Sequence, residues 1–187
     1  MIYKALQVVT GQLNGYLKLS FKLREDIAFL SPIKDEDKVY PTNRVSITLV
    51  GLERETSGGI SFQRTAISDT AVKKTAPAWQ MNVNILISVI FQDKQYEESL
   101  QILSAILSFI QKNNMITSQD QSVSFAMDPV NLSIQELANL WGICGDSYFP
   151  SMMCRLRVLT VDEGEILDLS AIMKTRELST GNKNNDQ

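Results

Sequence analysis

The chain has 187 residues, of which 44% are hydrophobic and 21% are charged, and its 18 Lys and Arg against 21 Asp and Glu give a formal net charge of −3. This length and composition are typical of one globular domain with a sizeable apolar core. The chain has no histidine, which excludes Ser-His-Asp and Cys-His nucleophiles, two-histidine zinc sites and the usual general base near neutral pH.

The net charge and the cysteine content exclude further classes of function. The chain lacks the basic excess that a nucleic-acid-binding protein usually carries, so we expect no nucleic-acid partner. Its two cysteines, Cys144 and Cys154, cannot form a four-thiolate metal site or a disulfide framework. Nothing near them in the sequence would lower a thiol pKa, so both are predicted to be small buried hydrophobic residues.

The N-terminal residues lack the charged and then apolar pattern of a signal peptide. The most apolar runs, 85–91 and 102–110, are shorter than the roughly 18 residues that a membrane span requires. We therefore expect a protein that is assembled in the cytoplasm, with no signal peptide and no direct insertion into a membrane.

Apolar residues recur at steps of three and four from Ile2 to Leu17, which predicts an amphipathic helix. Gly11 and Gly15 fall inside this helix, and each weakens it by about 1 kcal/mol relative to alanine. We therefore expect close packing or local irregularity at both glycines. The elements predicted next are a short strand over 26–30, a polar loop over 31–38 and an alternating strand over 44–52.

The strongest strand pattern covers 81–91, where one face is entirely apolar and the other carries Asn82, Asn84, Leu86, Ser88 and Ile90. Such a strand belongs in the middle of a sheet with at least one face covered by helices. Ser133-Ile134-Gln135-Glu136 forms a capping box, which fixes the start of a helix. The remaining predicted elements are a helix over 94–113, a short strand over 123–127, a strand over 152–161 and a helical segment over 166–173.

These elements predict one α/β (α+β) domain over residues 1–176, built on a small mixed or antiparallel sheet flanked by helices. The region of about 54–76 is expected to be an extended loop or hairpin arm, which often carries binding function. Residues 177–187 are small and polar and are expected to form a disordered tail.

The sequence contains three weak signals for catalysis or ligand binding. Ser31-Pro32-Ile33-Lys34 matches the S-x-x-K pattern of serine acyl-enzymes, but it contains a proline and has no partner motif. The acidic segment Asp162–Asp168 could hold a hard cation, but its spacing is not that of a calcium loop, and a solvated turn after a strand explains it better. Gly58-Gly59 is followed by neither Lys-Ser/Thr nor a helix start, so no nucleotide site is supported. We predict no catalytic, cofactor-binding or metal-binding residue.

Several segments of this chain, taken in order, carry a family resemblance. They are Met1–Leu6, Asn43–Val50, Ala76–Trp79, Tyr96–Leu100, Phe109–Asn113, Leu137–Gly142, Tyr148–Met152 and Arg155–Leu159. Together they resemble the tail-terminator, or tube-cap, proteins of phage-tail-like contractile injection systems of the antifeeding-prophage type. The resemblance covers about residues 1–163, and its most specific part runs from Leu-Trp-Gly through Pro-Ser to Arg-x-Arg-Val.

The resemblance implies a phage tail-terminator-like fold and a structural role without enzymatic activity or cofactor. Such a protein forms a ring, expected to be a homohexamer, on the last ring of the inner tube and contacts the end of the sheath. It sits at the end of the particle distal from the baseplate, stops polymerisation and fixes the length. The candidate contacts to these partners are Arg64, Lys73 and Lys74 of the arm, together with Arg155 and Arg157, which should leave one sheet face together.

Two other functions stay open at this point. The chain could be a small carboxylate-dependent metal-binding enzyme that uses the Asp162–Asp168 cluster. It could also be a ligand-binding α/β module with a dominant apolar pocket.

Overall fold

The larger of the two units of the chain is built on a curled six-stranded sheet. The computed structural model describes residues 1–33, 43–55, 63–68, 71–75, 79–121, 123–144, 148–161 and 166–171. The first unit comprises Met1–Ser57 and Trp79–Val161, and the second comprises Gly58–Ala78 and Asp162–Gln187. In chain order the first unit contains α1 (Ile2–Phe21), β1 (Ala28–Leu30), β2 (Arg44–Arg54), β5 (Trp79–Ile90), the 3-10 helix η1 (Asp93–Gln95), α2 (Tyr96–Lys112), β6 (Met115–Thr117), β7 (Ser124–Pro129), α3 (Ile134–Cys144) and β8 (Ser151–Val161).

The sheet of the first unit has the order β1-β2-β5-β8-β7-β6. Only the β1–β2 pair is parallel, so the sheet is mixed, as predicted. The strand predicted over 81–91 is β5, and it lies between β2 and β8, where its residues from Asn82 to Ile90 are all buried. This position explains the nearly continuous apolar sequence, because both faces of a central strand are covered.

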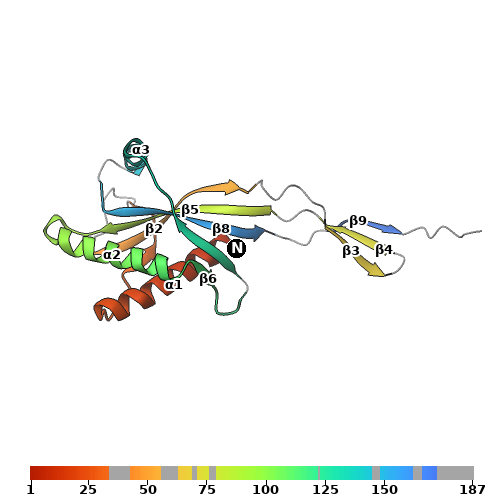
Figure 1. Ribbon diagram of the computed structural model, residues 1–187, viewed down its shortest axis with the longest axis horizontal. Coiled ribbons are helices and arrows are strands. Elements are labelled where there is room, and N and C mark those ends of the chain that lie inside the picture. Colours follow the sequence, from red (N-terminus) through yellow and green to blue (C-terminus); the bar gives the residue numbers. More distant parts are fainter. Residues whose placement is uncertain are drawn as a thin grey trace, which may run out of the picture. The chain divides into compact units, whose positions relative to one another are not determined.

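Helices cover the two faces of this sheet unequally (Figure 1). On one face, α1 and α2 enclose the main core, into which β5 contributes Val83, Ile85, Ile87 and Val89. On the other face, α3 packs Trp141 against Leu86 and Ile90 of the same strand. The prediction of a single domain with a small mixed sheet flanked by helices is therefore confirmed for the first unit.

Helix α1 also binds both edges of the sheet with two amide side chains. At one edge, the buried Asn14 donates from Nδ2 to the Ala28 carbonyl of β1 at 2.8 Å and accepts the Ala28 amide at 2.9 Å through Oδ1. At the other edge, Gln12 Nε2 donates to the Thr117 carbonyl of β6 at 3.0 Å. Strand edges expose unpaired backbone groups, so these contacts close groups that could otherwise pair with another chain.

The predicted capping box is present at the start of α3. The Ser133 amide donates to Glu136 Oε2 at 2.8 Å, and the Glu136 amide donates to Ser133 Oγ at 3.2 Å. The bond from the Ser133 amide, and a second one from the Ser133 hydroxyl to the same oxygen at 2.7 Å, lower the pKa of the Glu136 carboxyl below its ordinary value. The two amide bonds satisfy two backbone donors that the first helical turn leaves free.

The second unit is a three-stranded sheet of β3 (Gln63–Ser68), β4 (Ala71–Thr75) and β9 (Ile166–Ala171), in the order β3-β4-β9. Strands β3 and β4 pair antiparallel within the region predicted as an arm, and β9 returns from the far end of the sequence to pair with β4. The boundaries 1–176 for the domain, 54–76 for the arm and 177–187 for the tail stay predictions, and the last of these ranges lies outside the described residues.

Two predictions are wrong. The segment 166–173 was expected to be helical, but its residues Ile166–Ala171 form β9, because pairing with β4 outweighs a weak local preference. Close packing or local irregularity was expected at Gly11 and Gly15, but α1 runs continuously through both, and a Cβ added at either position meets no atom within 4 Å beyond the helix's own backbone and the neighbouring residues. Both glycines lie on the exposed side of α1, whose buried stripe consists of other residues.

Replacing Gly15 by alanine should therefore stabilise the protein. Alanine is favoured over glycine by about 1 kcal/mol inside a helix, and no neighbouring atom opposes the added methyl group. We expect the free energy of unfolding in urea to rise by roughly 0.5–1 kcal/mol for Gly15→Ala. A loss of stability would show that the position is crowded or strained.

The two cysteines should differ sharply in reactivity. Burial, with a smaller contribution from the Asp128 carboxylate, raises the pKa of the Cys154 thiol to about 12, whereas Cys144 at the end of α3 is only partly buried. Because the thiolate is the reactive form, iodoacetamide at pH 8 should modify Cys144 and leave Cys154 intact in the folded chain. Peptide mass mapping would measure this, and rapid labelling of Cys154 would contradict its burial.

The same raised pKa makes stability depend on pH. The folded state retains the Cys154 proton while the unfolded state loses it near the ordinary thiol pKa, so this residue destabilises the fold as pH rises from about 9 towards 12. Cys154→Ala removes that dependence, and comparing unfolding at pH 8 and pH 10 tests it.

Candidate functional site

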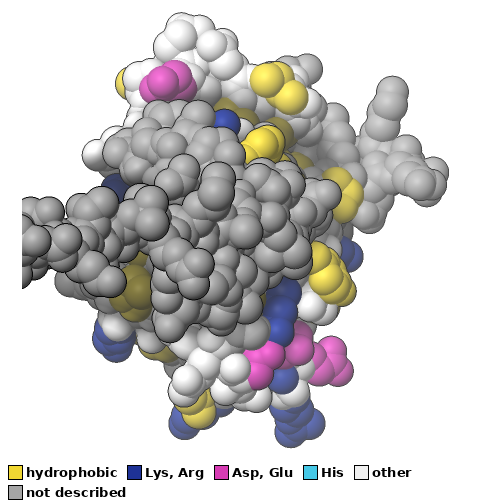
Figure 2. Space-filling model, turned by 90° about the vertical axis from the view of Figure 1, so that its right-hand side faces the viewer, with side chains coloured by type: hydrophobic (Ala, Val, Ile, Leu, Met, Phe, Trp, Pro, Cys, Tyr) yellow, Lys and Arg dark blue, Asp and Glu magenta, His cyan; other side chains and the backbone are white. Residues whose placement is uncertain are grey.

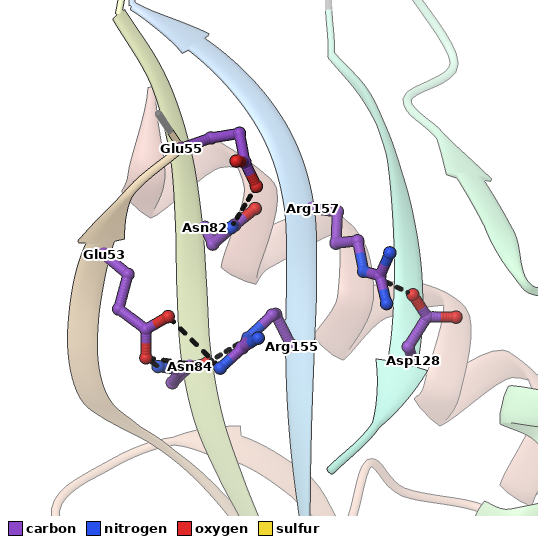
Figure 3. A network of polar contacts seen from close by, with 7 residues as sticks. All are labelled: Glu53, Glu55, Asn82, Asn84, Asp128, Arg155 and Arg157. Carbon is purple, nitrogen blue, oxygen red and sulfur yellow. Dashed lines mark hydrogen bonds and ion pairs between the residues drawn. The ribbon is translucent and has the colours of Figure 1, made fainter. Parts of the chain in front are cut away.

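A row of polar side chains crosses four adjacent strands on the sheet face opposite α1 and α2 (Figure 3). We call this row the polar ladder. Its members are Glu53 and Glu55 from the end of β2, Asn82 and Asn84 of β5, Arg155 and Arg157 of β8, and Asp128 of β7. Further along the same face of β5, Leu86 and Ile90 lie under α3, so the polar ladder occupies the part that α3 leaves uncovered.

Glu53, Asn84 and Arg155 form the centre of the polar ladder. Asn84 Nδ2 donates to Glu53 Oε1 at 2.6 Å, and Arg155 Nε donates to Asn84 Oδ1 at 3.0 Å. The triangle closes through an ion pair between Arg155 Nη2 and Glu53 Oε2 at 3.1 Å. Each polar atom of the buried Asn84 amide thus has a charged partner, which makes these bonds stronger than those between neutral groups.

A second carboxylate–amide pair lies next to this triangle. Asn82 Nδ2 donates to Glu55 Oε2 at 3.1 Å, in the same arrangement that joins Asn84 to Glu53. The Oδ1 atom of Asn82 is buried and has no hydrogen-bond partner among the described residues. A buried acceptor without a hydrogen-bond partner costs about 1–3 kcal/mol of stability.

Arg157 completes the ladder at its other end. Its Nε lies 2.9 Å from Asp128 Oδ2, and the Arg157 side chain is 56% exposed against 33% for Arg155. An exposed pair of this kind contributes roughly 0–1 kcal/mol. The three carboxylates and two guanidinium groups of the ladder leave one negative charge in excess.

The five residues predicted to contact partners are divided between the two units of the chain. Arg155 and Arg157 leave the same sheet face, as expected, and each forms an ion pair within the chain. Arg64 lies on β3 and Lys73 and Lys74 on β4, with Arg64 opposite Lys74 in the register. The contact role of all five residues stays a prediction.

The carboxylates and amides of the polar ladder were not among the candidate site residues predicted from the sequence. A signal for them was present, because Glu53 and Glu55, like Asn82 and Asn84, are two residues apart on strands and therefore share a face. That these four residues lie beside Arg155 could not be predicted, because it depends on the register between β2, β5 and β8.

The weak chemical signals gain no support from the described residues. Ser31 hydrogen-bonds to Ser46 through its hydroxyl at 2.9 Å, while Lys34, Gly58-Gly59 and Asp162–Glu165 lie outside the described residues. Within the described part of the chain no three His, Cys, Asp or Glu residues gather as a metal site would require. Nor does any described helix have the length and apolar character needed to cross a membrane.

Figure 2 shows how charged and hydrophobic side chains are distributed on one face of the molecule. Basic and acidic side chains lie next to one another in this view, and hydrophobic side chains are scattered between them.

Removing Arg155 should cost much more stability than removing Arg157. Arg155→Ala leaves the buried Asn84 Oδ1 without its donor, so we expect a loss of about 1–3 kcal/mol. Arg157→Ala breaks an exposed pair, and the expected loss is below about 1 kcal/mol. Urea unfolding of both variants measures the difference, and equal effects would show that the triangle of Glu53, Asn84 and Arg155 is not coupled to folding.

Comparison with known proteins agrees with this fold. The sequence matches the family described as the Pvc16 N-terminal domain over residues 5–170. Comparison with curated proteins gives no match.

Two solved structures are similar to the chain over nearly all of its length. One is the sheath/tube terminator of PVC, an extracellular contractile injection system, in the extended state, with a TM-score of 0.71 and 18% identity over 100% of this chain and 65% of that chain. The other is the tube-terminating cap of the anti-feeding prophage, with a TM-score of 0.55 and 17% identity over 92% of this chain and 60% of that chain. The chain thus spans less than two thirds of the length of either structure.

These likenesses show a shared fold, and the family match covers most of the sequence. The resemblance to tube-cap proteins that the sequence carries is therefore confirmed, and the chain belongs to the Pvc16 N-terminal domain family.

Proposed function

We propose that the chain is a terminator subunit that caps the inner tube and the sheath of a contractile injection system. The observation that carries this proposal is the likeness to the PVC sheath/tube terminator over the whole of this chain. In this role the protein binds the last tube ring and the sheath end, stops polymerisation and so fixes the particle length. It acts by binding alone and is not an enzyme.

The polar ladder supports a contact role. Its charged side chains are held by one another in the isolated chain, so little side-chain freedom is lost when a partner covers them. A surface prepared in this way binds with a smaller entropic cost than one with free arginines. The excess carboxylate suits a partner surface that carries positive charge.

We further propose that the subunits form a closed ring, with six as the expected number, at the end distal from the baseplate. A ring requires two different surfaces on each chain that fit head to tail. Arg64, Lys73 and Lys74 in the second unit, with Arg155 and Arg157 in the first, are the proposed contacts to neighbours, tube or sheath. Assembly in the cytoplasm belongs to the same proposal.

The capping role predicts a defined effect on length. Particles assembled from tube and sheath subunits with the purified chain present should have one narrow length, whereas particles assembled without it should vary in length. Negative-stain electron microscopy measures both distributions, and native mass spectrometry counts the chains in the ring. Identical length distributions, or a chain that stays monomeric at high concentration and on particles, would contradict the proposal.

Arg157→Ala and Arg155→Lys provide matched variants for this assay. Arg157→Ala should fold normally, so weaker capping by this variant would assign Arg157 to a contact. Arg155→Lys keeps the charge but loses the fork geometry, and it tests whether the order of the ladder, rather than its charge, is recognised.

A further inference from the structure

Helix α3 is held on the sheet by far fewer buried side chains than α1 and α2. Six residues of α1 and five of α2 are buried, whereas Trp141 is the only buried residue among the 11 of α3. Ile134 and Ile143, near the two ends of α3, are 89% and 87% exposed. Elements with few buried apolar contacts open at a lower free energy than the core does, so α3 has the weakest attachment of these three helices.

The aromatic contacts of Trp141 lie within the connection that carries α3. Its ring centre is 5.8 Å from that of Tyr148 and 5.9 Å from that of Phe149, both in edge-to-face geometry. Tyr148 and Phe149 follow α3 in the same connection between β7 and β8. Against the sheet itself, Trp141 packs on Leu86 and Ile90 of β5. A movement of α3 away from the sheet can therefore keep the aromatic contacts and separate only the contacts with β5.

Polar atoms on this side of the sheet weaken the attachment further. Ser88 lies on the same face of β5, directly opposite Ser151 of β8. The Oγ atoms of both serines and Nε1 of Trp141 are buried, and none of the three has a hydrogen-bond partner among the described residues. Each of these groups bonds to water when it is exposed, so its burial favours the arrangement in which α3 has moved away.

The connection that carries α3 is fixed to the sheet at both of its ends. At the first end, the Val130 amide donates to the Met153 carbonyl at 2.8 Å. At the second end, the Val89 amide donates to the Pro150 carbonyl, also at 2.8 Å. The part between these two bonds, which contains α3, can therefore move while the strands on either side stay paired.

We propose that α3 is a lid, which lifts from the sheet in the folded protein by a local opening. Closed, the lid covers Leu86, Ser88 and Ile90 of β5. These three residues continue the row that Asn82 and Asn84 begin, because alternate residues of a strand share one face. The lid therefore controls how much of the face with the polar ladder is accessible. This inference goes beyond the proposed terminator function and does not depend on it.

Hydrogen exchange of the Trp141 indole N–H, measured by NMR on the full chain, tests the lid. This N–H is buried under α3, and the amides of Ile85 and Ile87 in β5 report on unfolding of the core. The protection factor of the indole should be at least ten-fold lower than those of the two amides. Urea below the unfolding transition should accelerate the amides much more than the indole, because a local opening exposes little surface.

Two serine variants test the role of the unpartnered atoms. Ser88→Ala removes a hydroxyl that favours the open state, so exchange of the Trp141 indole should slow at least three-fold. Ser46→Ala is the matched control, because Ser46 lies opposite Ser88 on β2 and its hydroxyl donates to the Ser31 carbonyl at 3.1 Å. The control should not slow the exchange. Circular dichroism and urea unfolding establish that both variants fold.

Two results would overturn the lid. If the Trp141 indole exchanges as slowly as the β5 amides and with the same urea dependence, α3 leaves the sheet only when the whole fold unfolds. If Ser88→Ala does not slow the exchange three-fold, or Ser46→Ala slows it equally, the buried hydroxyl does not favour opening. Neither measurement involves tube or sheath subunits. Failure of the lid therefore leaves the terminator function standing, and failure of capping leaves the lid standing.

Discussion

The position of α1 across the sheet is the constraint on which the rest of the first unit depends. Its buried stripe, which includes Leu13 and Leu17, fills the core opposite β5, and each large apolar side chain so buried contributes about 1.5–3 kcal/mol. Between these apolar residues the helix places Asn14 in the core, where a polar group is tolerated only with full hydrogen bonding. The register of the helix is therefore fixed twice, by apolar packing and by the backbone of β1.

The two faces of the six-stranded sheet therefore differ in what they carry. The face under α1 and α2 is closed and apolar, and it gives the strands their order and rigidity. The opposite face carries α3 at one end and the polar ladder at the other, so charged groups lie on a stiff support. The proposed terminator role requires a fixed surface rather than a flexible one, and this support provides it.

Elements with a strong local pattern could be predicted from the sequence, and elements that depend on distant partners could not. Strand β5 has one entirely apolar face, and the capping box of α3 is a local chemical signal, so both were recognised. Strands β6 and β9 are short and take their conformation from β7 and β4, which no local pattern reveals. The ladder shows the same division, because Arg155 and Arg157 were recognised by their spacing, whereas Glu53 lies 102 residues from Arg155 in the sequence.

Apart from a bulge between Leu49 and Gly51, the pairing of β2 with β5 continues up to Arg54 opposite Met81, and beyond it the Glu55 amide still bonds to Gln80. The residues between these two strands therefore form a long connection whose two ends are held by hydrogen bonds between β2 and β5. The entropic cost of closing such a connection rises only slowly with its length. The length of this connection can therefore change with little effect on the register between β2 and β5.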